Sequence, residues 1–243
     1  KNYLSKYPVH KKAAIAYVKD KNIKNFAEPH KNNIYLLKLD FKNFFNSIKI
    51  SDFYEFCKEF SIPVQDQEIL GLLLFCKNKQ DELYLSIGAP SSPALSNILM
   101  FEFDNKVFNL CKEYNVIYTR YADDLAFSTN KPNVLSKILL EIIELCKRLN
   151  YPRNLQINTD KTIFTSKKYN RTLTGLVISN DGNISIGREK KRTLRAMAHQ
   201  AKLGSLSPAQ VKTLLGKIAF LKSIDPNFAT QLEDKYLNSS EQT

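Results

Sequence analysis

The chain has 243 residues, of which 43% are hydrophobic, and 36 Lys and Arg against 24 Asp and Glu give it a formal net charge of +12. No stretch approaches the roughly 20 consecutive apolar residues that cross a bilayer, so no membrane-spanning helix is expected. Positive charge in this excess favours a polyanionic partner, with nucleic acid ahead of a membrane surface; the alternative is a soluble protein that is merely basic.

The four cysteines lie far apart in the sequence and include no CxxC pair. They predict reduced thiols in a hydrophobic core, rather than disulfides or zinc ligands, and a cytoplasmic protein. Only three histidines are present, so a His-rich metal site is not expected. Because Lys1-Asn2-Tyr3 carries neither an initiator Met nor a signal-peptide core, we expect the sequence to begin inside a longer chain.

Strand and helix patterns alternate through the first half of the chain. Residues 33–40 form a short apolar run that stops at a carboxylate, which is typical of a buried strand. Residues 51–60 predict a helix with a serine N-cap at residue 51, and residues 67–77 predict a second helix. A turn rich in Gly and Pro over residues 86–93 leads into residues 94–114, which predict one long amphipathic helix.

An acidic hairpin is expected in the middle of the chain. Two strand-like runs, residues 116–121 and 125–128, are separated by Ala-Asp-Asp, which predicts a hairpin with two carboxylates at its tip. A helix over residues 134–149 follows. Short strands are then expected near residues 155–158, 163–166 and 172–179, with a turn at residues 180–182.

The pattern becomes purely helical after Gly187. Helices are expected over residues 188–203 and 207–223, and Asp225-Pro226 starts a third. The second helix opens with Ser-Pro-Ala-Gln, which combines an N-cap, a proline at the first helical position and the glutamine of a capping box. The change predicts a boundary near Gly187 between an α+β body, residues 1–187, and a basic helical appendage, residues 188–243.

Three aspartates form the strongest candidate site. Asp40 ends the first strand and Asp123 and Asp124 lie at the hairpin tip, so two neighbouring strands would bring the three carboxylates together. An isolated Asp-Asp pair is more often a solvated turn, but carboxylates packed this closely repel one another unless cations neutralise them. Two Mg²⁺ ions about 4 Å apart would do so and would also catalyse phosphoryl transfer. Oxygen ligands without His or Cys clusters favour Mg²⁺ over Zn²⁺.

Four motifs resemble those of reverse transcriptases, in the order in which that family carries them. The resemblance covers nearly the whole chain and implies a right-hand polymerase of the α+β class, with fingers and palm over residues 1–187 and a helical thumb over residues 188–243. Asp40 in LKLDFKNFF looks like the first catalytic aspartate, IGAPSSPALSN at residues 87–97 is similar to QGAPxSPxLSN, Tyr121-Ala122-Asp123-Asp124 looks like YxDD, and NTDKT at residues 158–162 resembles the motif whose lysine lies near the incoming phosphates.

This resemblance implies a role for each motif residue. Asp40, Asp123 and Asp124 would be catalytic and, with the backbone carbonyl of Phe41, would hold two Mg²⁺ ions. Phe45 would clash with a ribose 2′-hydroxyl and so select dNTPs; the alternative is that Phe45 belongs to the core, as Phe44 would. Further nucleotide contacts would be Gly88, Ala89, Lys161, Lys19 and Lys21, and nucleic-acid contacts would be Tyr121, Thr174, Gly175, Arg188, Lys191, Arg192 and Arg195.

Two segments look like retron reverse transcriptases in particular. TLTGLVIS at residues 172–179 is similar to the segment with the V-T-G triplet of that group, and FAEPH at residues 26–30 resembles their N-A-x-x-H motif. Leu173, Phe26 and Ile87 stand where relatives keep Val, Asn and Gln. The resemblance implies a structured noncoding RNA template, priming from the 2′-hydroxyl of a guanosine, an RNA–DNA product, and phage defence with a separate effector protein.

Other functions remain as alternatives. A group II intron or another defence-associated reverse transcriptase would share the same motifs. A catalytically silent RNA-binding scaffold would have lost carboxylates, whereas all three are present. An RNA-dependent RNA polymerase or primase would carry a small or acidic residue at position 45 instead of a phenylalanine.

Overall fold

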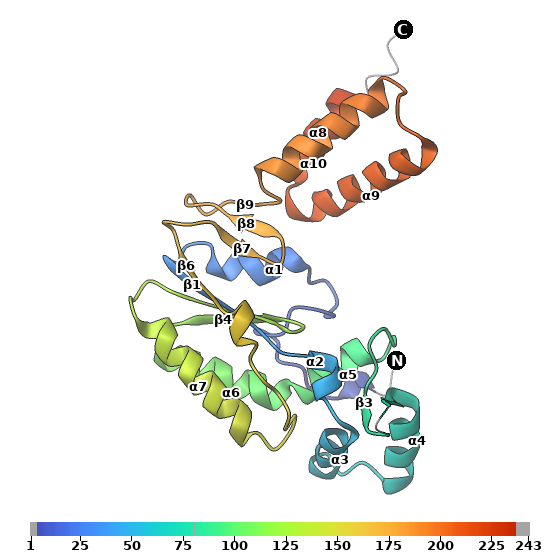
Figure 1. Cartoon of the computed structure of the whole chain (residues 1–243), viewed down its shortest axis with the longest axis vertical. Helices are drawn as coiled ribbons and strands as arrows, with labels where there is room; N and C mark the ends of the chain where they lie inside the picture. Colours follow the sequence, from blue (N-terminus) through green and yellow to red (C-terminus); the bar gives the residue numbers. More distant parts are fainter. Residues whose placement is uncertain (1–3, 80, 237–243) are drawn as a thin grey trace.

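The structure, a computed structural model, describes residues 4–79 and 81–236. Its centre is a four-stranded antiparallel sheet in the order β4-β5-β1-β6 (Figure 1). The strands are β1 (Tyr35–Asp40), β4 (Ile117–Tyr121), β5 (Asp124–Thr129) and β6 (Ile163–Ser166), which confirms the expected strand before Asp40, the acidic hairpin and the strand over residues 163–166.

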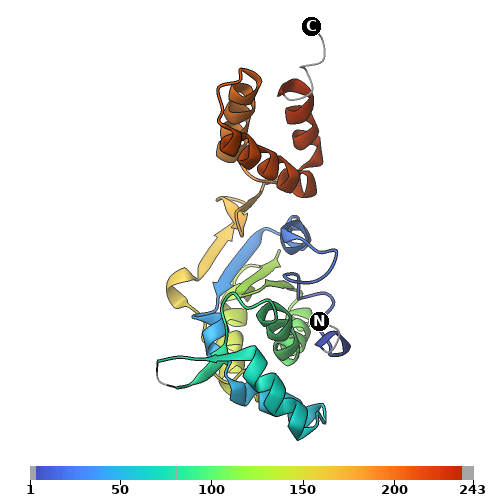
Figure 2. The ribbon, with the colours of Figure 1, turned by 90° about the vertical axis from the view of Figure 1, so that its right-hand side faces the viewer.

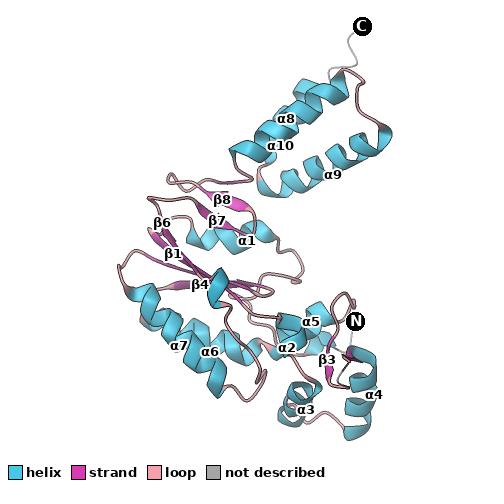
Figure 3. Ribbon diagram, viewed as in Figure 1, coloured by secondary structure: helices cyan, strands magenta, loops and turns pink. Residues whose placement is uncertain are grey.

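Both faces of the central sheet are covered. Leu37 and Leu39 of β1 belong to one hydrophobic cluster and Leu36 to a second, because successive side chains of a strand point to opposite faces. A strand buried on both faces is a continuous apolar run rather than an alternating one, as residues 33–40 are. Figure 3 shows helices on one side of the sheet and a helix with a smaller sheet on the other.

Helices α6 (Phe101–Glu113) and α7 (Val134–Arg148) cover the first face. The expected helix over residues 134–149 is confirmed, but the single helix expected over residues 94–114 is wrong. It is two helices, α5 (Ser92–Leu99) and α6, which separate at the fully buried Met100, where ψ is 0°. Apolar residues occur on both sides of this break, so the sequence pattern runs through it.

A helical subdomain lies beside the sheet, with η1 (Leu4–Lys6), α2 (Phe44–Ser47), α3 (Ile50–Glu59), α4 (Val64–Leu74) and a hairpin of β2 (Phe75–Lys77) and β3 (Leu83–Leu85). The expected serine N-cap is wrong, because α3 begins one residue earlier and the Lys49 N–H donates to Asp52 Oδ2 at 2.8 Å. The helix expected over residues 67–77 is α4, which begins earlier, at Val64, and ends at Leu74. Residues 75–77 form strand β2 instead, because they pair with β3. An apolar run alone does not reveal this pairing.

The second face carries α1 (Ile23–Ala27), η2 (Glu28–His30) and a small sheet of β7 (Arg171–Leu173), β8 (Leu176–Ile178) and β9 (Ile184–Ser185). The strand expected over residues 172–179 is therefore a hairpin, whose turn holds Thr174 at φ 45° and Gly175 at φ 83°. The strand expected near residues 155–158 is wrong: only Ile157 forms an isolated bridge, to Phe41, before η3 (Thr159–Lys161).

Three helices form one end of the molecule (Figure 2): α8 (Arg188–Lys202), α9 (Pro208–Ile224) and α10 (Pro226–Tyr236). All three were expected, and the capping box of α9 is confirmed, since the Ser207 N–H donates to Gln210 Oε1 at 2.9 Å. Gly187 precedes α8 with φ 84°. Leu214 and Ile218 of α9 share the second hydrophobic cluster with Phe26 and Leu173, so this end packs on the body.

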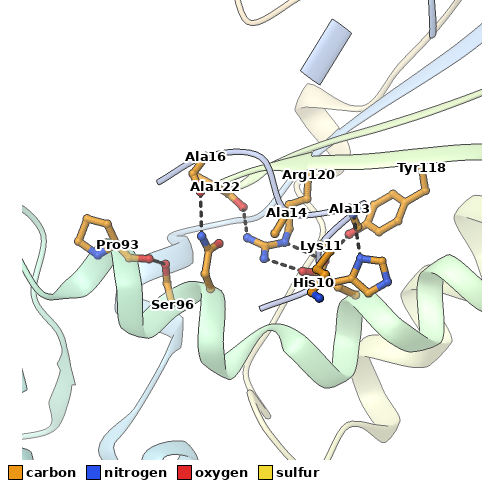
Figure 4. Close-up of polar contacts among 12 residues, drawn as sticks. His10, Lys11, Ala13, Ala14, Ala16, Pro93, Ser96, Tyr118, Arg120 and Ala122 are labelled. Atoms are coloured by element: carbon orange, nitrogen blue, oxygen red, sulfur yellow. Dashed lines mark hydrogen bonds and ion pairs between the residues drawn. The ribbon is translucent and has the colours of Figure 1, made fainter. Parts of the chain in front are cut away.

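A buried network of charge joins α6 to β4. Arg120 and Asp104 are both 0% exposed, and Arg120 donates to Asp104 through Nε at 2.9 Å and through its second guanidinium nitrogen at 2.6 Å. The Tyr118 hydroxyl donates to the same carboxylate at 2.7 Å. Arg120 also donates to the carbonyl oxygen of Ala122 at 3.1 Å, which extends the network to the hairpin tip (Figure 4).

His30 forms a second polar network, on the other face of the sheet. Its Nε2 lies 2.8 Å from Thr119 Oγ1 and its Nδ1 2.7 Å from Ser128 Oγ. Because the Thr119 hydroxyl donates to the Phe26 carbonyl, it must accept from His30, which assigns the proton to Nε2. Complete burial lowers the pKa of His30 to about 3, so the ring is neutral.

The cysteines are free, and Cys57, Cys111 and Cys146 are buried as expected, while Cys76 of β2 is partly exposed. Within residues 4–79 and 81–236, no helix is both long and apolar enough to cross a membrane.

Candidate active site

Two strands bring the three expected aspartates to one end of the central sheet. Asp40 ends β1 and lies opposite Asp124, the first residue of β5, in the antiparallel register. Tyr121 pairs with Asp124, so the hairpin loop consists of Ala122 and Asp123 alone, with Ala122 at φ 58°. The Phe41 N–H donates to the Asp123 carbonyl at 3.2 Å, which fixes the loop against the end of β1.

The negative charges of these aspartates repel one another. Burial raises the pKa of Asp123, and the charge of Asp40 raises it further. The pKa of Asp124 is likewise raised, first by burial and then by the charge of Asp123. The Thr174 hydroxyl donates to Asp124 Oδ2 at 3.3 Å and partly offsets these effects. Ionised carboxylates held in this way favour the arrival of a cation.

Asp40 already has a cationic partner. Lys161 Nζ lies 3.1 Å from its Oδ1 and 3.3 Å from its Oδ2. Asn158 Nδ2 donates weakly to Oδ1 at 3.5 Å. The pair with Asp40 raises the pKa of Lys161, so the expected phosphate-binding lysine does reach the aspartates.

The donor set suits a hard divalent cation. Among the residues that the structure describes, no three His, Cys, Asp or Glu side chains converge closely enough to hold a metal by themselves. Asp123 and Asp124 nevertheless offer oxygen donors whose repulsion a cation would relieve. The Phe41 N–H contacts the hairpin loop through the Asp123 carbonyl, so the backbone of Phe41 adjoins the aspartates.

The two phenylalanines that follow Asp40 have different surroundings. Phe44 is 3% exposed and stacks on Phe41 with a ring separation of 5.6 Å. Phe45 is partly exposed and packs edge-on against Phe44 at 5.2 Å. Of the two rings, Phe45 is therefore the one available to a ligand.

The remaining expected nucleotide contacts lie in separate loops. Gly88 is exposed at φ 86°, with nothing within 4 Å of the place where a Cβ would stand. Ala89 is half-buried, and its carbonyl accepts from the Ser92 N–H at 3.2 Å. Lys19 is exposed. Lys21 instead donates to the carbonyls of Lys11 and Ala14 at 2.5 and 2.9 Å, so it holds the N-terminal segment.

Two residues near the aspartates were not expected. Lys38 lies two positions before Asp40 on the same face of β1, and a cavity of about 360 Å³ beside it is also lined by Asp40, Asp124 and Thr174. Tyr17 has φ 62° and is 52% exposed, and its pKa is raised by burial and then by the charge of Asp123. A basic residue in a strand and a tyrosine in a loop carry no sequence signal for this placement.

Helix α8 divides the expected nucleic-acid contacts between two faces. Lys191 Nζ lies 2.5 Å from Asp225 Oδ2 and 4.7 Å from the ring of Phe228, and Arg195 lies 4.8 Å from that same ring. Both therefore pack toward α10. Arg188 and Arg192 are exposed.

The face of α8 nearer the aspartates borders a second cavity. It measures about 460 Å³ and lies between the β7–β8 turn and helices α8 and α9. Lys190 Nζ donates to the Gly175 carbonyl at 3.1 Å, and both residues line the cavity together with Lys217 and the half-exposed Phe220. Thr174 lies at its lip and contacts Asp124, so this cavity adjoins the aspartates. Tyr121, also expected, is half-buried against Phe26 with 5.7 Å between ring centres.

Known proteins resemble the chain over nearly its full length. The family model for reverse transcriptase (RNA-dependent DNA polymerase) matches residues 1–178. The retron Ec83 reverse transcriptase of Escherichia coli is 39% identical over 233 residues, which are 94% of this chain and 74% of that protein. The retron Ec73 reverse transcriptase, also of Escherichia coli, is 36% identical over 247 residues, which are 97% of this chain and 77% of that protein.

Among solved structures, telomerase from Candida albicans in complex with the TWJ fragment of telomeric RNA has the same kind of fold. The TM-score is 0.52 at 13% identity, over 92% of this chain and 46% of that one. A likeness at that identity supports the right-hand α+β architecture and nothing finer.

Proposed function

The chain belongs to the reverse transcriptase family, as an RNA-directed DNA polymerase of the retron type, and we propose that it copies part of a structured noncoding RNA into DNA by two-metal-ion nucleotidyl transfer. Its substrates would be dNTPs, and its product an RNA–DNA hybrid. We assign residues 1–187 to fingers and palm and residues 188–243 to the thumb, since the secondary structure becomes purely helical after Gly187.

One observation carries the proposal: Asp40 and Asp124 face each other in register, and Asp123 lies beside them in a two-residue loop. With the Phe41 carbonyl, these residues would hold two Mg²⁺ ions. Bound divalent cations would lower the pKa of a primer hydroxyl and neutralise the leaving pyrophosphate. The raised pKa values of Asp123 and Asp124 support a site that needs added positive charge.

The chain's own residues would position the nucleotide. Lys161 is the expected partner of the triphosphate, and Lys19 is a more distant candidate. Phe45 would exclude a ribose 2′-hydroxyl, since it is the partly exposed ring of the pair after Asp40. The open backbone at Gly88 and Ala89 would allow a close approach of the nucleotide.

We propose that the template and product follow the α8–α9 cavity rather than the α10 side of the thumb. Thr174 and Gly175 line this cavity together with Lys190 and Lys217, which add positive charge. Thr174 contacts Asp124, and Tyr121 pairs with Asp124 across the hairpin. Exposed Arg188 and Arg192 would contact phosphates further along. Lys191 and Arg195 would instead act indirectly, by fixing α10 through Asp225 and Phe228.

Two of the departures from the retron motifs fall at buried positions. Phe26 is fully buried and packs on Tyr121, and Leu173 is 2% exposed in the same cluster. An apolar side chain suits both places. Ile87 is different, because it is 70% exposed beside Gly88 and could alter how the template is held.

A role in phage defence, with a separate effector protein, is proposed from the likeness to retron enzymes. The free cysteines support a reducing compartment such as the cytoplasm.

Sequencing the nucleic acid that copurifies from the native operon tests the function. Wild type should carry a short DNA joined to one structured RNA, and Asp123→Asn should carry the RNA alone. Unbranched DNA, or copies of an intron or of many RNAs, would exclude retron-type synthesis while keeping polymerisation. RNA without DNA in both samples would favour a silent RNA-binding scaffold.

A further inference from the structure

The cation that touches the aspartates belongs to the chain itself. Lys161 Nζ contacts both carboxylate oxygens of Asp40, at 3.1 and 3.3 Å. Asp124, by contrast, is held by the neutral hydroxyl of Thr174 at 3.3 Å. The positive charge is therefore paired with the aspartate of β1, while the two aspartates of the hairpin retain their mutual repulsion.

The backbone ahead of Lys161 is fixed, whereas its side chain is not. The Lys42 N–H donates to the Gln156 carbonyl and the Asn158 N–H to the Asp40 carbonyl, each at 2.8 Å, which docks this segment on the end of β1. The side chain of Lys161 is 64% exposed, and that of Asp40 is 14% exposed. A lysine ammonium on a flexible four-carbon stem can exchange one anion for another without movement of its backbone.

We propose that Lys161 is an internal counter-ion, which occupies the carboxylate of Asp40 until a nucleotide binds and then transfers to the triphosphate. The inference rests on the proposed function, in which Asp40 is a metal ligand. When Lys161 moves to the triphosphate, its ammonium group gives up both contacts with Asp40. Metal would therefore bind the nucleotide-free enzyme weakly, because it must displace Lys161, and the nucleotide would release Asp40 by taking the lysine.

Mn²⁺ binding to the nucleotide-free full chain tests this, with the free ion counted by electron paramagnetic resonance. Lys161→Met keeps the stem and removes the charge, so Mn²⁺ should bind about two- to five-fold more tightly, the range set by one exposed ion pair. Lys161→Arg keeps the ion pair and should bind Mn²⁺ as wild type does. Lys161→Met should also raise the KM for dNTP. Unchanged or weaker Mn²⁺ binding by Lys161→Met would overturn the proposal.

Lys38→Met is the charge-matched control. Lys38 lies near the same aspartates, but its Nζ donates to Thr172 Oγ1 at 3.4 Å rather than to a carboxylate. It should tighten Mn²⁺ binding less than Lys161→Met does. If both variants tightened Mn²⁺ binding equally, the loss of any nearby positive charge would explain the effect, and the proposal would be overturned.

Asp123→Asn distinguishes a failure of the counter-ion proposal from a failure of the proposed metal site. If wild type binds Mn²⁺ more tightly than Asp123→Asn, the aspartates are a metal site, and the Lys161 variants then decide the counter-ion role alone. If wild type, Asp123→Asn and Lys161→Met all bind Mn²⁺ equally weakly, the metal assignment fails and the counter-ion role fails with it.

Discussion

One buried aspartate, Asp104, and a group of three others have opposite surroundings in the fold. Asp104, with Tyr118 and Arg120, forms what we call the buried network, in which one carboxylate accepts from an arginine and a tyrosine. Asp40, Asp123 and Asp124, for which we propose the catalytic role, form what we call the catalytic cluster, in which two carboxylates have pKa values raised by burial and by their neighbours. The same side-chain chemistry serves structure in one place and, as we propose, catalysis in the other.

The partner of a carboxylate, rather than its burial, separates the two roles. Asp104 is fully buried, and its charge-assisted bonds leave no demand for another cation. The catalytic cluster lies where β1 ends and β5 begins, so an added cation can reach it. Strand alternation makes this division: Tyr118 and Arg120 face α6, while Thr119 and Tyr121 face the other side of the sheet.

Removal of one catalytic charge should produce the largest effect. Asp123→Asn should reduce dNTP incorporation on a primed RNA by a factor on the order of 10³ or more, because metal-ion catalysis contributes several kcal/mol. Its melting temperature should not fall, since the change relieves repulsion. Primer-extension and thermal-melting assays of the same preparation measure both. Incorporation close to wild type would remove Asp123 from the catalytic cluster.

A substitution in the buried network should lower stability. Asp104→Asn leaves the guanidinium of Arg120 buried without its counter-charge, so the free energy of unfolding should fall by about 3–5 kcal/mol in urea titrations. Glu113→Gln removes an exposed acid from the same helix and should change it by less than about 0.5 kcal/mol. If Asp104→Asn lowered the free energy of unfolding only slightly, Arg120 would have to donate to water or to another acceptor.

Phe44 and Phe45 show the same contrast between a structural and a functional role, here in two uncharged side chains. Phe45→Ala should lower discrimination of dNTP against NTP roughly tenfold or more, because a ring that excludes a hydroxyl contributes about 1–3 kcal/mol. Phe44→Ala, by contrast, should lower stability and leave this discrimination nearly unchanged. Ratios of kcat/KM for the two nucleotide types measure it. Equal discrimination by Phe45→Ala and wild type would assign Phe45 to the core.

Acid should reveal the effect of a single proton, through His30. Its folded pKa of about 3 lies below the ordinary 6.5, so between these values the unfolded chain binds a proton that the folded chain does not. Stability should therefore fall as the pH falls below 6.5, by about 1.4 kcal/mol per pH unit, and His30→Gln should show a shallower fall. His199, which is exposed, supplies the control: His199→Gln should keep the wild-type slope.

Local patterns predicted the catalytic cluster better than the buried network. Residues 33–40 are apolar on both faces, and Ala-Asp-Asp separates two strand-like runs, so both elements of the cluster were visible in sequence. Asp104 and Arg120 are separated by a helix end and a turn, and each is an ordinary charged residue in its own element. Only the packing of α6 on β4 makes them partners.

The remaining errors have the same origin. The break at Met100, the strand over residues 75–77 and the turn at Thr174-Gly175 depend on contacts with other segments, which an apolar run does not record. The positive charge of α8 was visible, but the contacts of Lys191 and Arg195 were not, because their partners lie elsewhere in the chain: Asp225 follows α9 and Phe228 belongs to α10.

The two-residue loop between Tyr121 and Asp124 limits how this protein can change by mutation. Side chains alternate along β5, with Leu125 and Phe127 in one hydrophobic cluster and Ala126 in the other. One inserted or deleted residue at the tip would shift the register, turn Leu125 out of its cluster and carry Asp124 to the wrong face. Natural variants of this segment should therefore differ by substitution and keep its length.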